Sequence, residues 1–123
     1  MVEKILIKID KFEKSKKFLL KKYTLNSLSK ELNTNSAYLS KIINATKETN
    51  FANYLNELKI NEAIERLKTE KKFRAYTIKS IAEEVGFNTP QAFSQAFLRK
   101  TGIKPSYFIK KLNKEFITNK TES

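Results

Sequence analysis

The side chains of this chain that could perform chemistry are suited to binding and poorly suited to catalysis. The 123 residues include no His and no Cys, which removes the usual general base, the commonest zinc ligand and any disulfide or thiol-based site. The two glycines, Gly86 and Gly102, lie too far apart in the sequence to form a Gly-rich phosphate loop. We therefore predict that the chain is not an enzyme and holds no metal and no cofactor.

Positive charge is in large excess. The chain has 25 Lys and Arg against 13 Asp and Glu, which gives a formal net charge of +12. A basic balance of this size indicates a polyanionic partner, nucleic acid first and an anionic membrane surface second. No apolar run approaches the length of a membrane span. We predict a soluble binding domain that is cytoplasmic and associated with the nucleoid.

Two short segments carry the groups that recognise base edges in DNA. Gln91 and Gln95 can each form a bidentate pair with adenine, and Lys41 can reach guanine or a phosphate. Serine hydroxyls can donate or accept, and a small apolar side chain can contact the methyl group of thymine. The predicted base-reading residues are Ser36, Ala37, Ser40, Lys41, Asn44, Pro90, Gln91, Ser94 and Gln95.

A second set of residues is suited to contact with phosphates. Asn35 and Thr89 precede predicted helices, whose free N–H groups favour a phosphate, although their first expected role is to cap those helices. The alternative for every polar side chain in both sets is an ordinary solvated surface. The predicted phosphate-contacting residues are Asn35, Tyr38, Lys79, Thr89, Arg99, Lys100 and Lys104.

Helices must position both sets, because the apolar residues recur at helical spacing. Ile5, Ile7 and Ile9 also alternate as a strand would, but the stretch at 12–20 has no β-branched residue, so we predict a helix there. Thr24 and Thr77 are expected N-caps, Pro90 suits the first position of a helix, and Gly86 and Gly102 are expected to end helices. Residues 70–76 form a charged connection, in which Phe73 is the expected buried anchor. We expect about seven helices: 3–20, 25–33, one that follows Asn35 or Ser36, 51–68, 78–85, one from Pro90 to Gly102, and one from Pro105.

The inner faces of two of these helices decide which residues point outward. We expect one buried set from each helix, and the base-reading candidates then lie on the opposite faces. Leu98 is an apolar residue at an outward position, where it would pack on the long helix at 51–68 or touch a thymine methyl. The expected core residues are Leu39, Ile42, Ile43, Phe93, Ala96 and Phe97.

The chain contains an internal repeat. Residues 24–33 align with residues 77–86 at an offset of 53, and residues 38–43 align with residues 92–97 at an offset of 54. Each copy predicts a helix, a tight turn and a second helix, with Asn33 or Gly86 at a turn that favours a left-handed residue. A helix-turn-helix unit present twice accounts for this pattern. The alternative is a plain helical hairpin of a solenoid, which would need more units and a shorter period.

At these residues the sequence resembles the DNA-binding domain of the AraC/XylS family of bacterial transcription regulators. The resemblance covers residues 24–112. In the second copy it rests on Ile81-Ala82-x-x-Val85-Gly86-Phe87, Phe93-Ser94-x-x-Phe97, Thr101-Gly102 and Pro105-x-x-Phe108; in the first, on Leu28-Ser29-x-x-Leu32, Tyr38-Leu39-Ser40 and Phe51-x-x-Tyr54-Leu55.

The resemblance implies an all-α fold with two homeodomain-like helix-turn-helix subdomains joined by a long linker helix. Each subdomain would insert its second helix into the major groove. The expected divisions are a lead-in helix at 1–23, the first helix-turn-helix at 24–50, the linker at 51–69, the second helix-turn-helix with its closing helix at 70–113, and a tail at 114–123.

Two departures from the family pattern bear on the site. Lys47-Glu48 stands where the family usually has Thr-Gly, so the loop after the first recognition helix is expected to differ. Gln95 stands where a base-reading Arg is often found, which leaves the base composition of the DNA site open.

The leading function is sequence-specific DNA binding by a transcription regulator, with activation favoured because it is common in the family. Non-specific or architectural DNA binding and a protein-interaction module are the alternatives. Double-stranded DNA is the expected partner, and RNA polymerase is a second candidate. We expect no membrane partner and no small-molecule site. A short stand-alone regulator and an excised module of a larger sensor-regulator both remain open, as does the oligomeric state.

Overall fold

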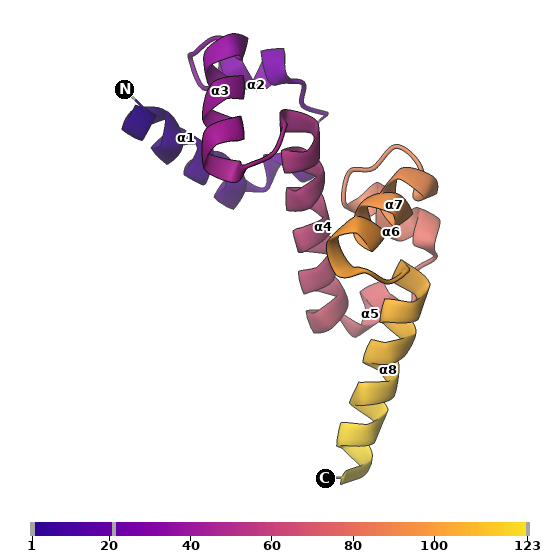
Figure 1. Ribbon diagram of the computed structural model, residues 1–123. Coiled ribbons are helices and arrows are strands. Elements are labelled where there is room, and N and C mark those ends of the chain that lie inside the picture. The colour runs from indigo at the N-terminus through magenta and orange to yellow at the C-terminus, as the bar shows by residue number, and fades with distance from the viewer. Residues whose placement is uncertain (1, 21, 123) are drawn as a thin grey trace. The chain divides into compact units, whose positions relative to one another are not determined.

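The computed structural model describes residues 2–20 and 22–122, with side chains described as far as Glu115. The described residues form eight α-helices and one 3-10 helix, and no strand (Figure 1). The all-α fold class is therefore confirmed. The helices are α1 (Val2–Ser15), η1 (Lys17–Leu19), α2 (Leu25–Glu31), α3 (Ser36–Lys47), α4 (Phe51–Thr69), α5 (Lys71–Arg74), α6 (Ile78–Glu84), α7 (Pro90–Thr101) and α8 (Pro105–Glu122).

The chain divides into two compact units, Met1–Lys59 and Ile60–Ser123, and the boundary lies inside α4. In the first unit, α2 packs against α3 and α1 contacts η1. The core of this unit combines residues from α1, η1, α2, α3 and the first half of α4. Its buried members are Ile5, Ile9, Phe12, Phe18, Tyr23, Leu28, Leu32, Leu39, Ile42, Ile43, Tyr54 and Leu55.

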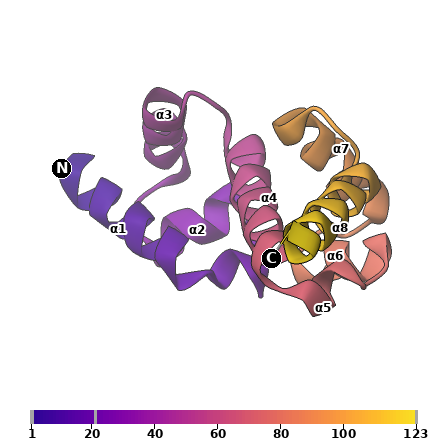
Figure 2. The same ribbon diagram turned by 90° about the horizontal axis from the view of Figure 1, so that it is seen from below.

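In the second unit, α7 lies beside both α6 and α8 (Figure 2). A chain of aromatic rings runs through it: the ring centroids of Phe93 and Phe97 lie 5.8 Å apart, and those of Phe97 and Phe108 lie 5.2 Å apart. Phe87 contacts Phe93 at 5.5 Å in an edge-to-face arrangement. Such pairs add to the free energy of burial, so α7 is held from both sides.

The same local hydrogen bonds begin the corresponding helices of both copies. The Thr24 hydroxyl accepts from the N–H of Ser27, and the Thr77 hydroxyl accepts from the N–H of Ser80. These caps confirm the predicted starts of α2 and α6, and each satisfies a backbone donor that the helix itself leaves unpaired.

The lead-in helix is shorter than the sequence predicted. It was expected to reach Leu20, but α1 ends at Ser15 and Lys16 adopts a left-handed conformation with φ 58°. The break brings Phe18 back into the core at 4% exposure, with its ring centroid 6.0 Å from that of Phe12. A continuous helix would have turned Phe18 away from the buried face, so burial of this ring outweighed helix continuity.

Two other boundaries differ from expectation. The connection at 70–76 contains the short helix α5, in which Phe73 is 1% exposed and Arg74 is 8% exposed; the prediction that Phe73 anchors this segment is confirmed. The final helix α8 continues to Glu122 and so extends through the segment expected to form a tail. Within the described residues, no helix is long and apolar enough to cross a membrane.

Candidate nucleic-acid interface

The first recognition helix, α3, separates a buried face from an exposed one. Its core residues are all buried as predicted. Among the predicted base-reading residues, Ala37, Lys41 and Asn44 are exposed, while Ser36 and Ser40 are half-buried. The helix therefore presents a mixed polar strip to solvent, of the kind that enters a major groove.

The second recognition helix, α7, repeats this division. Phe93, Ala96 and Phe97 are buried. Gln91 and Gln95 are exposed, and Pro90 and Ser94 are half-buried. One turn further along, Leu98 is 44% exposed.

The turns before the two recognition helices have the same backbone geometry. Asn33 and Gly86 both have positive φ, at 58° and 86°. In each copy the next residue bonds back across the turn: the N–H of Thr34 donates to the Ser29 carbonyl at 2.8 Å, and the N–H of Phe87 donates to the Ala82 carbonyl at 2.9 Å. This is a Schellman ending, which orients the following helix. The prediction of a left-handed turn residue is confirmed at both positions.

Two of the predicted phosphate-contacting residues are helix caps. The Asn35 side-chain oxygen accepts from the N–H of Tyr38 at 2.8 Å, and the Thr89 hydroxyl accepts from the N–H of Ala92 at 3.1 Å. Tyr38 is half-buried. The four basic members of the set, Lys79, Arg99, Lys100 and Lys104, are all exposed.

One predicted base reader has its hydroxyl engaged within the protein. The Ser36 hydroxyl donates to the Asn26 side-chain oxygen at 3.3 Å and lies 3.4 Å from the Ser29 hydroxyl. These contacts join the start of α3 to α2. Ser36 therefore has a structural role, which the sequence pattern did not indicate.

Polar contacts around Glu13 of α1 hold the last turn of α3. The Glu13 carboxylate accepts from the Tyr54 hydroxyl at 2.5 Å and lies 3.5 Å from the Lys47 amine. The Lys47 amine also lies 6.0 Å from the centroid of the Tyr54 ring. Burial, followed by the hydrogen bond to Glu13, raises the pKa of Tyr54 well above its usual value. Lys47, at one of the two family departures, is thus tied to α1 and α4.

A second tyrosine ties α2 to the segment before it. The Tyr23 hydroxyl donates to the Glu31 carboxylate at 2.9 Å, and its ring packs edge-on against Phe12 at 4.9 Å. Burial, with added contributions from Glu31, raises the pKa of Tyr23 to about 12. Elsewhere in the first unit, burial lowers the pKa of Lys59, and the positive charge of Lys22 lowers it further.

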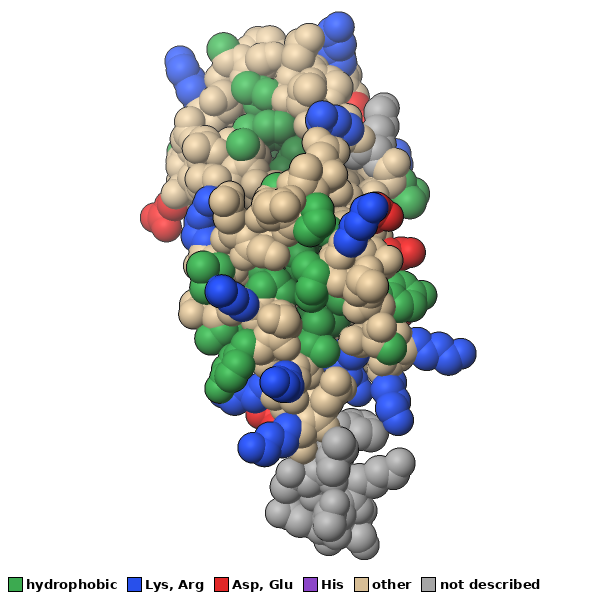
Figure 3. Space-filling model, turned by 90° about the vertical axis from the view of Figure 1, so that its right-hand side faces the viewer, with side chains coloured by type: hydrophobic (Ala, Val, Ile, Leu, Met, Phe, Trp, Pro, Cys, Tyr) green, Lys and Arg blue, Asp and Glu red, His purple; other side chains and the backbone are tan. Residues whose placement is uncertain are grey.

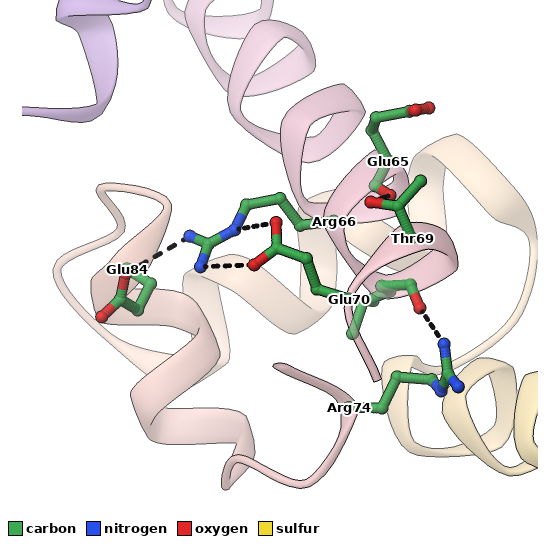
Figure 4. Close-up of polar contacts among 7 residues, drawn as sticks. Glu65, Arg66, Thr69, Glu70, Arg74 and Glu84 are labelled. Atoms are coloured by element: carbon green, nitrogen blue, oxygen red, sulfur yellow. Dashed lines mark hydrogen bonds and ion pairs between the residues drawn. The ribbon is translucent and has the colours of Figure 1, made fainter. Parts of the chain in front are cut away.

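In the second unit, Arg66 connects α4 with α6 (Figure 4). Its guanidinium lies 3.0 Å from the Glu70 carboxylate and 3.3 Å from the Glu84 carboxylate, and it sits 4.0 Å from the centroid of the Phe73 ring. This network was not predicted from the sequence. The i,i+4 spacing of Arg66 and Glu70 was the available signal, but Phe73 and Glu84 belong to two other helices, α5 and α6.

Arg74 of α5 connects α4 with α8 in the same unit. Its guanidinium donates to the Leu67 carbonyl at 2.8 Å and to the Asn113 side-chain oxygen at 2.8 Å. The cation is thus largely buried with its donors engaged, as burial of a charge requires. Arg74 thus joins α5 to α4 and α8, and Arg66 joins α4 to α5 and α6.

The exposed charge of the protein is mostly positive. On the face shown in Figure 3, Lys and Arg side chains are spread widely over the surface and Asp and Glu side chains are few. Within the described residues, no cluster of three or more Asp and Glu side chains is suited to hold a metal ion. Binding of a polyanion is the chemistry that this surface favours.

The family comparison matches this geometry. A family model described as a helix-turn-helix domain, of AraC/XylS type, matches residues 28–111. The raffinose operon transcriptional regulatory protein RafR of Pediococcus pentosaceus is 32% identical over 89 residues, which are 72% of this chain and 31% of that protein. The chain therefore spans less than a third of the length of this relative.

Two solved structures are similar in fold. The C-terminal domain of AraT, a response regulator from Geobacillus stearothermophilus, superposes with a TM-score of 0.70 and 28% identity, and covers 87% of this chain and 84% of that one. The DNA-binding domain of AdpA, a global transcriptional factor solved in complex with a target DNA, has a TM-score of 0.72 and 14% identity, with coverage of 93% and 94%. At that identity the AdpA likeness concerns the fold alone.

Proposed function

Because the chain belongs to the AraC/XylS-type family of helix-turn-helix DNA-binding domains, we propose that it is the DNA-binding module of a bacterial transcription regulator. This is a family of DNA-binding regulators and not an enzyme family. One observation carries the proposal: α3 and α7 occupy equivalent places in the repeat, and each buries its apolar face while its polar face is exposed.

The proposed mechanism is direct readout by both recognition helices. α3 and α7 enter successive major-groove segments, where exposed side chains pair with base edges. Gln91 and Gln95 are suited to adenine, and Lys41 to guanine. The exposed lysines and Arg99 supply most of the affinity and its dependence on salt, because they displace counterions from the phosphates. In this proposal the chain associates with the nucleoid, and as an activator it would also contact RNA polymerase.

Non-specific or architectural binding is the second candidate. The outward faces of α3 and α7 carry no Arg among the predicted base readers, and Ser36 is engaged with α2. A surface dominated by lysine binds DNA of any sequence through its phosphates. The two functions differ in the ratio of affinities for specific and random DNA.

Selection of bound duplexes from a random library with this chain tests the proposal. Enrichment of a motif with two blocks about one helical turn apart supports readout by both helices. Recovery of unenriched DNA, despite tight binding, favours the architectural alternative. Absence of DNA binding at low salt overturns both.

Two variants then separate base reading from phosphate contact. Gln95→Ala is expected to cost roughly 1–3 kcal/mol at one base pair of the selected site and little on random DNA. Lys100→Ala is expected to weaken binding to both about evenly. If Gln95→Ala leaves the ratio of matched to mismatched affinity unchanged, Gln95 does not read a base.

A further inference from the structure

A groove opens beside the start of the first recognition helix. It has a volume of about 670 Å³ and is lined by Lys4, Ile5 and Lys8 of α1, by the turn at residues 33–35, and by Tyr38 of α3. The groove lies within the first unit. It joins a helix to which the sequence assigned only a lead-in role with the turn that precedes α3.

The lining of the groove is positive and contains no carboxylate. Lys4 and Lys8 are four residues apart on α1, so both ammonium groups lie on the same side of that helix. Lys8 is held in place because its amine donates to the Leu32 carbonyl at 2.8 Å. Two of the three donors of that ammonium group are not needed for this bond. Two lysines in a concave surface without a counter-charge favour an anion of high charge density.

The position of the groove indicates which anion it would meet. Two of its lining residues, Asn35 and Tyr38, belong to the cap and first turn of α3. A duplex whose major groove received this end of α3 would bring its sugar-phosphate backbone past the adjoining surface. The second copy of the repeat has no comparable helix, because its preceding helix α5 has 4 residues whereas α1 has 14.

We propose that this groove binds a backbone phosphate of the DNA that flanks the segment read by α3, with Lys4 and Lys8 as its ligands. The inference rests on the proposed DNA-binding function and extends it. The first unit then contacts a longer stretch of backbone than the second, and α1 becomes part of the DNA-binding surface.

The test compares the salt dependence of DNA binding for the parent chain and two variants. Each substitution in these variants replaces one lysine by glutamine and so removes one positive charge. Lys4→Gln/Lys8→Gln removes both groove charges. Lys14→Gln is the matched control on the same helix, because Lys14 lies away from the groove and pairs with Asp10 at 3.0 Å on an exposed face. Affinity for the selected duplex is measured by fluorescence anisotropy at several salt concentrations.

The expected magnitude follows from counterion release. Each phosphate contact adds about −0.9 to the slope of log affinity against log salt. Loss of this one phosphate contact means that a fourfold rise in salt should weaken the parent about 3.5-fold more than Lys4→Gln/Lys8→Gln. Lys4→Arg/Lys8→Arg should restore most of the parental slope, and ethylation interference should show a flanking phosphate that matters for the parent and not for the Gln variant.

The outcomes are distinguishable. If the double Gln variant keeps the slope and the interference pattern of the Lys14→Gln protein, the groove does not bind a phosphate, although the proposed function stands. Lys4→Gln alone, which keeps the Lys8 bond to Leu32, should reduce the magnitude of the slope by less than the double variant does. An unchanged slope with the fold intact by circular dichroism also overturns the proposal. If the parent binds no DNA, the proposed function itself has failed.

Discussion

The C-cap of α3 stores backbone strain that its counterpart in α7 does not. Glu48 caps α3 in a left-handed conformation with φ 56°, and Gly102 caps α7 at the equivalent position with φ 80°. A residue with a Cβ in this conformation loses about 1–2 kcal/mol relative to glycine. The Glu48 carboxylate also lies at the negative end of the helix dipole, and this charge repulsion costs about 0.3–1 kcal/mol more.

Glu48→Gly should therefore stabilise the protein. Against the relief of strain and charge stands the added freedom of glycine in the unfolded chain, roughly 0.5–1 kcal/mol. Glu48 is exposed, so the substitution removes little packing. The net expectation is a gain of about 1 kcal/mol in the free energy of unfolding, or about 4 °C in Tm.

The assay is urea and thermal unfolding followed by far-ultraviolet circular dichroism, with three control variants. Ala45→Gly places glycine at an exposed helical position of α3 and should destabilise by about 1 kcal/mol. Glu48→Gln removes the charge alone, so its smaller gain should fade in high salt. Gly102→Ala should destabilise by about 0.5–1 kcal/mol, because backbone strain of about 1–2 kcal/mol outweighs the lost freedom of glycine in the unfolded chain. An added Cβ there would meet nothing within 4 Å, so no steric clash contributes.

Opposite signs for Glu48→Gly and Ala45→Gly are the diagnostic result. If both substitutions destabilise by similar amounts, the left-handed conformation at Glu48 costs nothing and the reasoning from φ is refuted. A gain that appears equally in Glu48→Gln would assign the whole effect to charge.

Three shorter predictions concern the supports of the two units. Gly86→Val should destabilise the second unit by at least about 1–2 kcal/mol, because the backbone at Gly86 has a positive φ, whereas Asn33→Gly should be tolerated. Equal Tm values for Gly86→Val and the parent would contradict the turn geometry. Arg66→Lys should lower the free energy of unfolding in urea by about 1 kcal/mol, because an ammonium group cannot contact both carboxylates and the Phe73 ring as a guanidinium does. An unchanged urea midpoint would show that the network is not stabilising. Burial and Glu31 raise the pKa of Tyr23 in the folded protein to about 12, so its contribution to stability is present below about pH 10 and is lost as the pH rises through about 12. Unfolding midpoints should therefore fall less steeply over this pH range for Tyr23→Phe than for the parent. Identical pH profiles would argue against the shift.

Features that depend on a few neighbouring residues were predictable from sequence. A cap requires a short polar side chain and an N–H group three residues later, and this local requirement identified Thr24, Thr77 and Thr89. The turn at Asn33 and the buried face of α3 followed from equally local rules. The repeat strengthened each prediction, because the same rules gave the same answer twice.

The features that were missed depend on residues distant in sequence. The Tyr54 hydroxyl reaches Glu13 across 41 positions, and Arg74 reaches Asn113 across 39. Neither pattern nor propensity specifies which charged side chains meet across such a separation. The early end of α1 has the same origin, since only the folded core shows that Phe18 must turn inward.

The base-reading and phosphate-contacting residues stay predictions, because they concern a partner. Exposure of Gln91, Gln95 and Lys41 is a necessary condition for base reading, and a solvated surface would show it equally. Binding measurements with the variants above are what distinguish the two.

The two copies stabilise the end of the recognition helix by different chemistry, and in the first copy α1 takes part. In the second copy, the Thr101 hydroxyl donates to the carbonyl of Phe97 or Ile103 and accepts from the N–H of Ile103, while Gly102 takes the left-handed position without strain. In the first copy Lys47 has no hydroxyl to do this, and its amine lies near Glu13 of α1 instead. A long-range contact thus stands where the other copy has a local one. α1 thus lies near both ends of α3: Glu13 is near Lys47, and Lys4 and Lys8 line the groove at the start of α3. In the proposed phosphate site, α1 would therefore both support the end of α3 and extend the candidate DNA surface beside its start.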